Sequence, residues 1–140
     1  MKFFQKEMIL PRYRRGFHLI TDQIRDEFSD IKNIDIGILH ILVKHTSAGI
    51  TINENADPTV RQDFESHFNK SVPENAPYYR HNYEGPDDMP AHIKTSIVGN
   101  EINIPITKGK LNLGTWQGIY FCEFRNYGIN RHIVLTAYGE

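Results

Sequence analysis

An almost unbroken apolar run from Ile36 to Val43 constrains the fold of this chain more than any other feature. The run is rich in β-branched residues and too short to cross a membrane, so it is typical of a strand in the middle of a sheet. We therefore predict a central strand that is covered on both sides. With 140 residues the chain can build one core around such a strand, whereas two separate domains would each be marginally small. A single domain spanning residues 1–140 is expected.

Shorter segments with strand-like patterns lie on both sides of this run. Apolar and polar residues alternate in several of them, as they do in strands with one buried face. We predict strands over residues 3–9, after Gly16, over residues 48–52 and over residues 102–106, and a hairpin formed by residues 116–125 and 131–138. The strand over residues 48–52 is expected to pair with the central strand that precedes it.

Three segments favour helices. Apolar residues recur every three or four positions over residues 20–31, with Thr21 or Asp22 placed to cap the helix. The Asp57-Pro58 pair provides a cap and a first helical residue for a second helix of about three turns, and a third helix is predicted over residues 90–98. Because the strands cluster instead of alternating strictly with helices, a total of about seven strands and three helices favours an antiparallel α+β fold.

The composition excludes several classes of partner. The chain carries 16 basic and 17 acidic residues, for a formal net charge of -1, and so lacks the positive surface on which nucleic-acid binding relies. No run of about 18 apolar residues occurs, and no membrane association is predicted. The single cysteine, Cys122, excludes an intramolecular disulfide and fits a reducing compartment, which makes the cytoplasm the expected location.

The first of two polar segments suited to metal binding joins His45-Thr46-Ser47-Ala48-Gly49 to Asn53-Glu54-Asn55-Ala56-Asp57-Pro58. Imidazole and carboxylate groups are common ligands of transition metals, and this segment offers both. Its two halves lie at opposite ends of a predicted strand, so they converge on one site only through a neighbouring chain or a return of the second half. The alternative is structural: Asp57 caps a helix, and residues 53–55 form a turn.

The second polar segment is His81-Asn82-Tyr83-Glu84-Gly85-Pro86-Asp87-Asp88-Met89-Pro90-Ala91-His92-Ile93-Lys94, most of it in a predicted loop of about 20 residues. With Pro90 as first helical residue, His92 lies in the opening turn, where the helix dipole keeps the imidazole neutral and free to bind metal. Free backbone N–H groups and Lys94 offer a seat for phosphate. Asp87 and Asp88 are expected to hold a cation or orient an imidazole, with Asp88 outside the core. The alternative is a solvated acidic loop.

Other polar residues carry weaker signals. Glu123 and Arg125 share one face of a predicted strand and are expected to reach a cleft together, while Cys122 lies on the opposite face as a core residue. No catalytic triad is indicated, since Ser47 lacks the turn that activates a hydrolase serine. The remaining histidines have no partners nearby in the sequence and are assigned structural or surface roles; they are His18, His40, His67 and His132.

The polar segments together resemble the YjbQ family. The resemblance rests on residues 45–58, residues 84–94, Gly114-Thr115-Trp116-Gln117-Gly118 and the terminal Gly139-Glu140, in the correct order. It implies a compact domain with a two-sheet, mainly antiparallel β-sandwich, and a homotrimer with sites near the subunit boundaries. It also implies a metal site that uses His45, His81 and His92, and a secondary thiamine-phosphate synthase activity. Lys44 departs from the uncharged residue or cysteine that many members have before the His-Thr-Ser-Ala run.

Three functions are compatible with these residues. The first is a metal-dependent transferase acting on phosphorylated small molecules, which joins a pyrimidine pyrophosphate to a thiazole phosphate; zinc is the expected divalent cation and magnesium the alternative. Glu54 or Asp88 positions the cation, and His92 handles a proton. Lys94 or Arg125 neutralises the charge on the departing pyrophosphate. Glu123 is a further residue predicted to take part in catalysis, and the residues predicted to bind the cofactor are Thr46, Ser47, Asn53, Lys94 and Arg125. The other functions are a metallohydrolase of a small phosphorylated metabolite and a noncatalytic metal-binding module.

Overall fold

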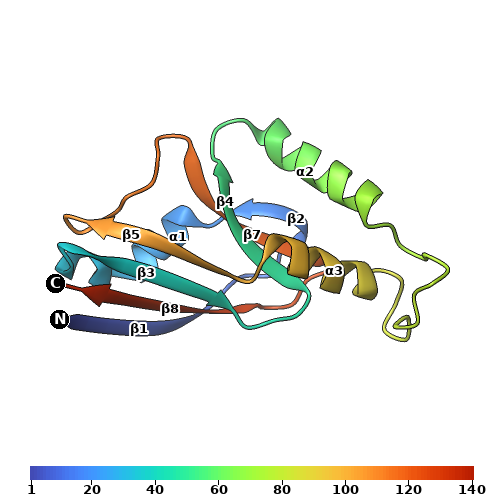
Figure 1. Cartoon of the computed structure of the whole chain (residues 1–140), viewed down its shortest axis with the longest axis horizontal. Coiled ribbons are helices and arrows are strands. Elements are labelled where there is room, and N and C mark those ends of the chain that lie inside the picture. Colours follow the sequence, from blue (N-terminus) through green and yellow to red (C-terminus); the bar gives the residue numbers. More distant parts are fainter.

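The computed structural model describes all 140 residues as two packed β-sheets, with helical segments both at the core between the sheets and on the outer face of the smaller sheet (Figure 1). The elements in chain order are β1 (Lys2–Ile9), β2 (Arg14–Leu19), α1 (Thr21–Glu27), the 3₁₀-helix η1 (Ser29–Asn33), β3 (Ile36–Val43), β4 (Ala48–Glu54), α2 (Pro58–Ser71), α3 (Asp88–Val98), β5 (Glu101–Thr107), β6 (Lys110–Leu111), β7 (Gln117–Tyr127) and β8 (His132–Gly139). In Figure 1 the three-stranded sheet lies between the five-stranded sheet and α2. The predicted two-sheet, antiparallel α+β architecture is confirmed.

The larger sheet has the strand order β1-β8-β3-β5-β6, and every pairing in it is antiparallel. β3 lies in its middle, as predicted. The inward side chains of Leu39, Ile41 and Val43 are buried, but on the outward face Ile36 is 70% exposed and Ile38 is half-buried. The prediction that this strand is covered on both sides is therefore wrong for the single chain. The outward face of β3 carries Ile36 and Ile38, and no layer of the same chain covers it.

The smaller sheet has the order β2-β7-β4. β4 pairs with β7 and not with β3, so the predicted pairing of residues 48–52 with the central strand is wrong. The predicted hairpin is wrong as well, because β7 and β8 belong to different sheets. In both cases a short connection, residues 44–47 or residues 128–131, carries the chain from one sheet to the other. Alternation identifies a segment as a strand, but it does not identify the partner of that strand.

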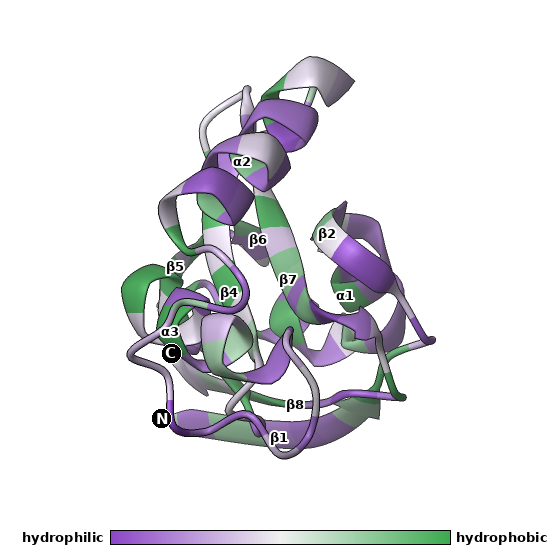
Figure 2. Ribbon diagram, turned by 90° about the vertical axis from the view of Figure 1, so that its right-hand side faces the viewer, coloured by the Kyte–Doolittle hydropathy of each residue, from purple (hydrophilic) through white to green (hydrophobic).

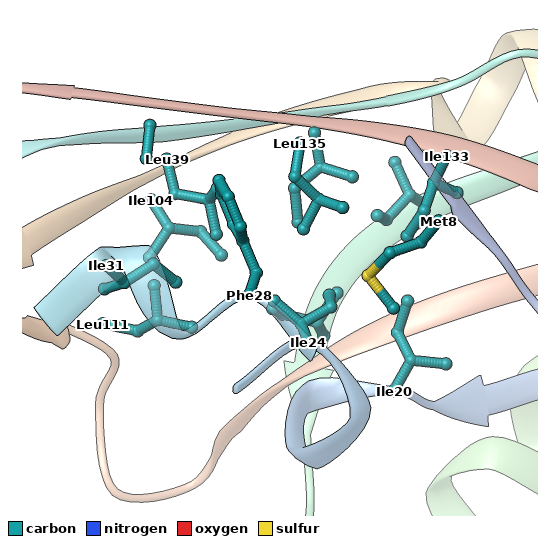
Figure 3. Packing of buried hydrophobic residues seen from close by; sticks show 14 of the residues in the cluster. Met8, Ile20, Ile24, Phe28, Ile31, Leu39, Ile104, Leu111, Ile133 and Leu135 are labelled. Atoms are coloured by element: carbon teal, nitrogen blue, oxygen red, sulfur yellow. The ribbon is translucent and has the colours of Figure 1, made fainter. Parts of the chain in front are cut away.

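The main hydrophobic core fills the space between the two sheets. It contains 20 buried residues from the inward faces of the sheets and from the α1–η1 segment. Figure 3 shows the side chain of Phe28, from that segment, directed toward Leu39 of β3 and Leu135 of β8. The apolar periodicity recognised in the sequence thus marks the residues that close this core.

The predicted single helix over residues 20–31 is interrupted at Phe28. This residue is buried and has φ of -120° and ψ of 64°, which separates α1 from η1. The predicted caps are also wrong, because Ile20 occupies the N-cap position and no side chain caps the helix. The hydroxyl of Thr21 instead accepts a hydrogen bond from the backbone N–H of Ile119 and so ties the start of α1 to β7.

A second, smaller core lies on the other face of the three-stranded sheet. Its buried residues are Phe17, Ala91, Tyr120, Cys122 and Phe124. Cys122 is thus a core residue, as predicted, and burial raises the pKa of its thiol. α2 is hydrophilic along most of its length (Figure 2) and packs on this core through Phe64 and Phe68. Its 14 residues make about four turns, one more than predicted.

α3 begins at Asp88, two residues before the predicted start at Pro90. Proline is tolerated at this position because the N–H groups of the first turn have no intrahelical acceptor. His92 therefore lies in the second turn, and Asp88, which was expected outside the core, is buried. Gly99 ends the helix with φ of +99°, in the region that favours glycine. None of the helices is long and apolar enough to cross a membrane.

Candidate metal centre

Three side chains converge at the start of α3. His81 comes from the loop between α2 and α3, whereas Asp88 and His92 lie four residues apart and therefore on one face of the helix. Nε2 of His81 lies 2.8 Å and Nε2 of His92 3.1 Å from the same oxygen, Oδ2 of Asp88. The ligand atoms of this three-ligand cluster (His81, Asp88 and His92) all lie within 4.8 Å of one another. The structure thus brings His81 and His92 together with an acidic residue, while metal binding by these residues stays a prediction.

The backbone carbonyl of Thr46 fixes the orientation of His92. Nδ1 of His92 lies 2.8 Å from this oxygen, and because a carbonyl only accepts, Nδ1 carries the hydrogen. In the neutral ring, Nε2 then directs a lone pair at Oδ2 of Asp88. Two lone pairs at this distance repel each other, so the arrangement calls for a proton or a cation between the two atoms. A histidine that donates its other N–H to a carbonyl is common among metal ligands in proteins.

Arg125 of β7 holds the acidic side of the cluster. Its Nε donates to Oδ2 of Asp87 at 2.9 Å, and its Nη1 donates to Oδ1 of Asp88 at 2.8 Å. Its Nη2 donates to the backbone carbonyl of Glu84 at 3.0 Å. One guanidinium group thus fixes the loop and both carboxylates at the start of α3, and it leaves Oδ2 of Asp88 to face the imidazoles.

The ionisation of the two carboxylates follows from these contacts. Burial alone would raise the pKa of Asp87, but the hydrogen bonds from Arg125 and from the backbone N–H of Asn126, together with the charge of Arg125, outweigh burial and the pKa lies below its ordinary value. For Asp88, burial again opposes ionisation, and the hydrogen bond with His81 helps to lower the pKa. The same contacts raise the pKa of Arg125, chiefly through its bond to Asp87. The cluster therefore presents ionised carboxylates at neutral pH.

The cluster fits a divalent cation in its ligands, its charge and its exposure. Zinc commonly takes two imidazole nitrogens and a carboxylate oxygen. Asp87 and Asp88 carry two negative charges against the single positive charge of Arg125. The side chain of Asp88 is 3% exposed, whereas those of His81 and His92 are 49% and 28% exposed. The open side leaves room for a further ligand from solvent, as in catalytic zinc sites.

Only the beginning of the first polar segment reaches this cluster. Thr46 contributes its backbone carbonyl, and the buried hydroxyl of Ser47 accepts a hydrogen bond from Arg131 at 3.0 Å. His45 points elsewhere, because its Nε2 accepts the backbone N–H of His132 at 2.9 Å. Burial, together with the charge of Arg131, lowers the pKa of His45. In the single chain His45 is not part of the cluster, and its role as a metal ligand stays a prediction.

The end of the first polar segment lies away from the cluster. Asn53 and Glu54 close β4 six residues after Ala48, about 20 Å along an extended strand. The carboxylate of Glu54 accepts the backbone N–H of Asp57, and Asp57 accepts the N–H of Thr59 at the start of α2. The structural alternative for Asp57, a helix cap, is confirmed.

Lys94 and Glu123 are buried and bound to other partners. Nζ of Lys94 donates to Oδ1 of Asn69 in α2 at 2.6 Å, and burial lowers the pKa of the ammonium group. Glu123 accepts two hydrogen bonds from Arg131, at 2.8 and 2.6 Å. The expectation that Glu123 reaches a cleft together with Arg125 is wrong, since Glu123 is fully buried. Sequence reasoning missed Arg131, because a single basic residue before an apolar strand carries no distinctive pattern.

Comparison with known proteins shows the family of this chain. Residues 6–140 match the family described as UPF0047 protein YjbQ-like. The chain belongs to the UPF0047 family. The UPF0047 protein YjbQ of Salmonella typhimurium is 51% identical over 138 residues, which cover 99% of each chain.

Two solved structures of the same fold extend the comparison. A YbjQ-like protein of unknown function from Sulfolobus solfataricus matches with a TM-score of 0.87 and 27% identity over 99% of both chains. A conserved hypothetical protein from Thermus thermophilus matches with a TM-score of 0.80 and 32% identity, covering 92% of this chain and 97% of that one. The names of these two proteins state no activity.

The Asp87–Arg125 pair predicts a specific response to acid. Because the pKa of Asp87 is depressed below 3.8, its contribution to stability is present above that value and is lost as the pH falls through the folded-state pKa. Asp87→Asn should lower the free energy of unfolding by about 1–3 kcal/mol at neutral pH. It should also flatten the dependence of stability on pH below about 4.

Urea denaturation between acid and neutral pH, with the protein freed of metal by a chelator, measures the contribution of the Asp87–Arg125 pair to stability. Asp26→Asn, at an exposed residue without an ion-pair partner, is the matched control and should leave the pH dependence unchanged. Equal acid sensitivity in the wild type and Asp87→Asn would show that the pair does not stabilise the fold.

Proposed function

We propose that this UPF0047 protein binds a divalent cation, zinc rather than magnesium, through His81, Asp88 and His92 and uses it to act on phosphorylated small molecules. The observation that carries the proposal is the convergence of two imidazole nitrogens on one carboxylate oxygen. Because Nδ1 of His92 donates to Thr46, the lone pair of its Nε2 faces the Asp88 carboxylate, and only a positive charge between the two atoms removes their repulsion. The nitrogen ligands favour zinc, since magnesium prefers oxygen ligands.

The exposure of the cluster supports a catalytic role over a purely structural one. Structural zinc sites are closed by four protein ligands, whereas catalytic sites have three and an open position. Here the single chain supplies three ligand atoms, and the side chain of His81 is half-exposed. A metallohydrolase would release hydrolysed precursors, and a noncatalytic module would form no product. Product analysis therefore separates both alternatives from the transferase.

In the proposed reaction the cation and the side chains of the protein have different roles. When bound, the cation polarises a phosphoryl oxygen and offsets the charge that develops on the leaving group. Arg125 keeps Asp88 ionised and in place. His92 acts as a ligand and does not transfer a proton, because its Nδ1–H is held by the carbonyl of Thr46. Lys94, bound to Asn69, is assigned no contact with the reacting phosphate.

The loop beside the cluster supports a substrate that contains a flat ring. Tyr83 is 98% exposed and Tyr78 is 77% exposed. A cavity of about 260 Å³ adjoins His81 and is also lined by Tyr79 and Met89. Aromatic faces stack with flat heterocycles. We extend the proposal to a weak thiamine-phosphate synthase reaction, in which a thiazole nitrogen bonds to the pyrimidine methylene carbon and the bond from that carbon to pyrophosphate breaks.

We also propose that the protein assembles as a homotrimer. The outward face of the five-stranded sheet supports self-association. Phe3, Tyr138, Ile38 and Pro105 follow one another across four strands in register and form an apolar row without a covering layer. The rings of Phe3 and Tyr138 stack with centroids 6.2 Å apart. A second copy of the chain is the occupant that the family resemblance implies for this face.

Metal content tests the ligand assignment. His81→Ala and His92→Ala should each reduce bound zinc sharply, since each removes one of three ligands. His67→Ala is the matched control, because His67 lies on α2 outside the three-ligand cluster and its side chain hydrogen-bonds with Ser71. Elemental analysis of the purified proteins gives the answer. If His92→Ala retains the zinc content of the wild type, the assignment is wrong.

Product analysis tests the reaction. Asp88→Asn should lower metal-dependent turnover by roughly 10-fold or more, because the imidazoles lose the carboxylate that shares the cation. Glu84→Gln, at an exposed acid of the same loop, should leave turnover unchanged. The substrates are the pyrimidine pyrophosphate and thiazole phosphate, and chromatography separates thiamine phosphate from hydrolysed precursors.

The distribution of products separates the candidate functions. Hydrolysed precursors alone would support the metallohydrolase, and metal binding without turnover would support the noncatalytic module. Activity is expressed per folded molecule, since Asp88 is buried and its substitution also affects stability.

Light scattering in dilute neutral buffer tests the assembly and should report three chain masses. Ile38→Lys places a charge within the apolar row and should shift the mass toward that of one chain. Asp63→Lys, on the exposed face of α2, is the control and should remain trimeric. A wild-type protein with the mass of one chain would refute the proposed homotrimer.

A further inference from the structure

A buried ion pair lies behind the three-ligand cluster. Glu123 of β7 is 0% exposed and Arg131, in the connection to β8, is 4% exposed. Nε of Arg131 donates to Oε1 of Glu123 at 2.8 Å, and Nη2 donates to Oε2 at 2.6 Å. Two parallel hydrogen bonds of this kind fix both distance and orientation. The pair has no surface on which a substrate can bind.

One branch of contacts leads from Arg131 to His92. Nη2 of Arg131 also donates to the hydroxyl of Ser47 at 3.0 Å. Ser47 follows Thr46 directly, and the carbonyl of Thr46 accepts the Nδ1–H of His92. The ion pair thus holds the connection between β3 and β4 at the point where that connection sets the tautomer of a metal ligand.

A second branch leads from Glu123 to Asp88. Oε2 of Glu123 accepts the backbone N–H of Arg125 at 3.2 Å. The guanidinium of Arg125 in turn holds Asp88 at 2.8 Å. We infer that Glu123 and Arg131 are the positioning pair of the metal centre, which align His92 through one branch and Asp88 through the other. This inference rests on the proposed function for the identity of the ligands.

Positioning explains the pair better than stability does. A buried ion pair often contributes no more to stability than apolar residues of the same volume, because both charges lose their hydration. Apart from each other, the side chains of Glu123 and Arg131 bond only to Ser47 and Arg125, the first members of the two branches. The backbone of Gly128 also closes on Glu123, since a Cβ atom there would come within 2.6 Å of Oε1. The carboxylate therefore has a single fixed place from which both ligands are set.

The test separates positioning from folding. Glu123→Gln keeps the shape and removes the charge, Arg131→Lys keeps the charge and removes the two-pronged geometry, and the double variant Glu123→Leu/Arg131→Met replaces the pair by apolar volume. Each should weaken zinc binding by roughly 10- to 100-fold, the usual range for groups that orient a ligand. Each should also change the visible absorption of the cobalt-substituted protein. Glu65→Gln breaks a different ion pair, with Arg15, and should change neither.

A second readout needs no metal. In the metal-free wild type, nitrogen NMR should find a hydrogen on Nδ1 of His92 in every molecule, whether or not Nε2 also carries a proton, and the variants should show a fraction of rings without the Nδ1 hydrogen. If the wild type binds no metal, the proposed function fails, while the tautomer result still decides this inference. Folded variants with wild-type zinc affinity and an unchanged His92 tautomer would overturn it. If none of these variants folds, Ser47→Ala, which removes only the bond from Arg131, decides by the same two readouts.

Discussion

Burial of β7 on both faces is the constraint on which the rest of the structure depends. Residues 118–124 of this strand are buried without interruption. Ile119 and Phe121 face the core between the sheets, while Tyr120 and Phe124 face the core beneath α2 and α3. Each face therefore requires its own covering layer. The five-stranded sheet covers one face and the helices cover the other, so this strand sets the order of layers in the protein.

The same burial explains the charged network around the candidate metal centre. Glu123 lies in the buried part of β7, where an unpaired carboxylate would be costly, and Arg131 compensates it. Two residues further along, Arg125 emerges at the end of the strand and pairs with Asp87 and Asp88. Arg125 thus attaches Asp88, the carboxylate of the candidate site, to the most deeply buried strand of the fold. A site built on such rigid elements can hold ligand atoms within the narrow tolerances that a metal requires.

The two polar segments contribute to the site in different ways. The second supplies side chains, and its Asp88 and His92 are grouped by helical spacing alone. The first supplies a backbone group, the carbonyl of Thr46, while the side chain of Glu54 serves the start of α2. The side chain of His45 is used to bind the connection before β8. The His-Thr-Ser-Ala run therefore supports the three-ligand cluster within one chain and adds no ligand atom to it there.

What the sequence determined by itself was local. Nearly every strand and helix was recognisable, because apolar periodicity depends on neighbours within one turn or one pleat. His81, Asp88 and His92 were recognisable as a group because they lie within twelve positions of one another. The tertiary structure alone decided which strands pair, and it exchanged the roles of β3 and β7: the uninterrupted run of β3 has an open face, while β7, interrupted by Glu123, is buried on both. It also brought together partners far apart in the chain, since Thr46 and His92 lie 46 positions apart and Ser47 and Arg131 lie 84 positions apart. No local pattern encodes such contacts, because they form only when two sheets close on a shared core and buried polar groups must find partners there.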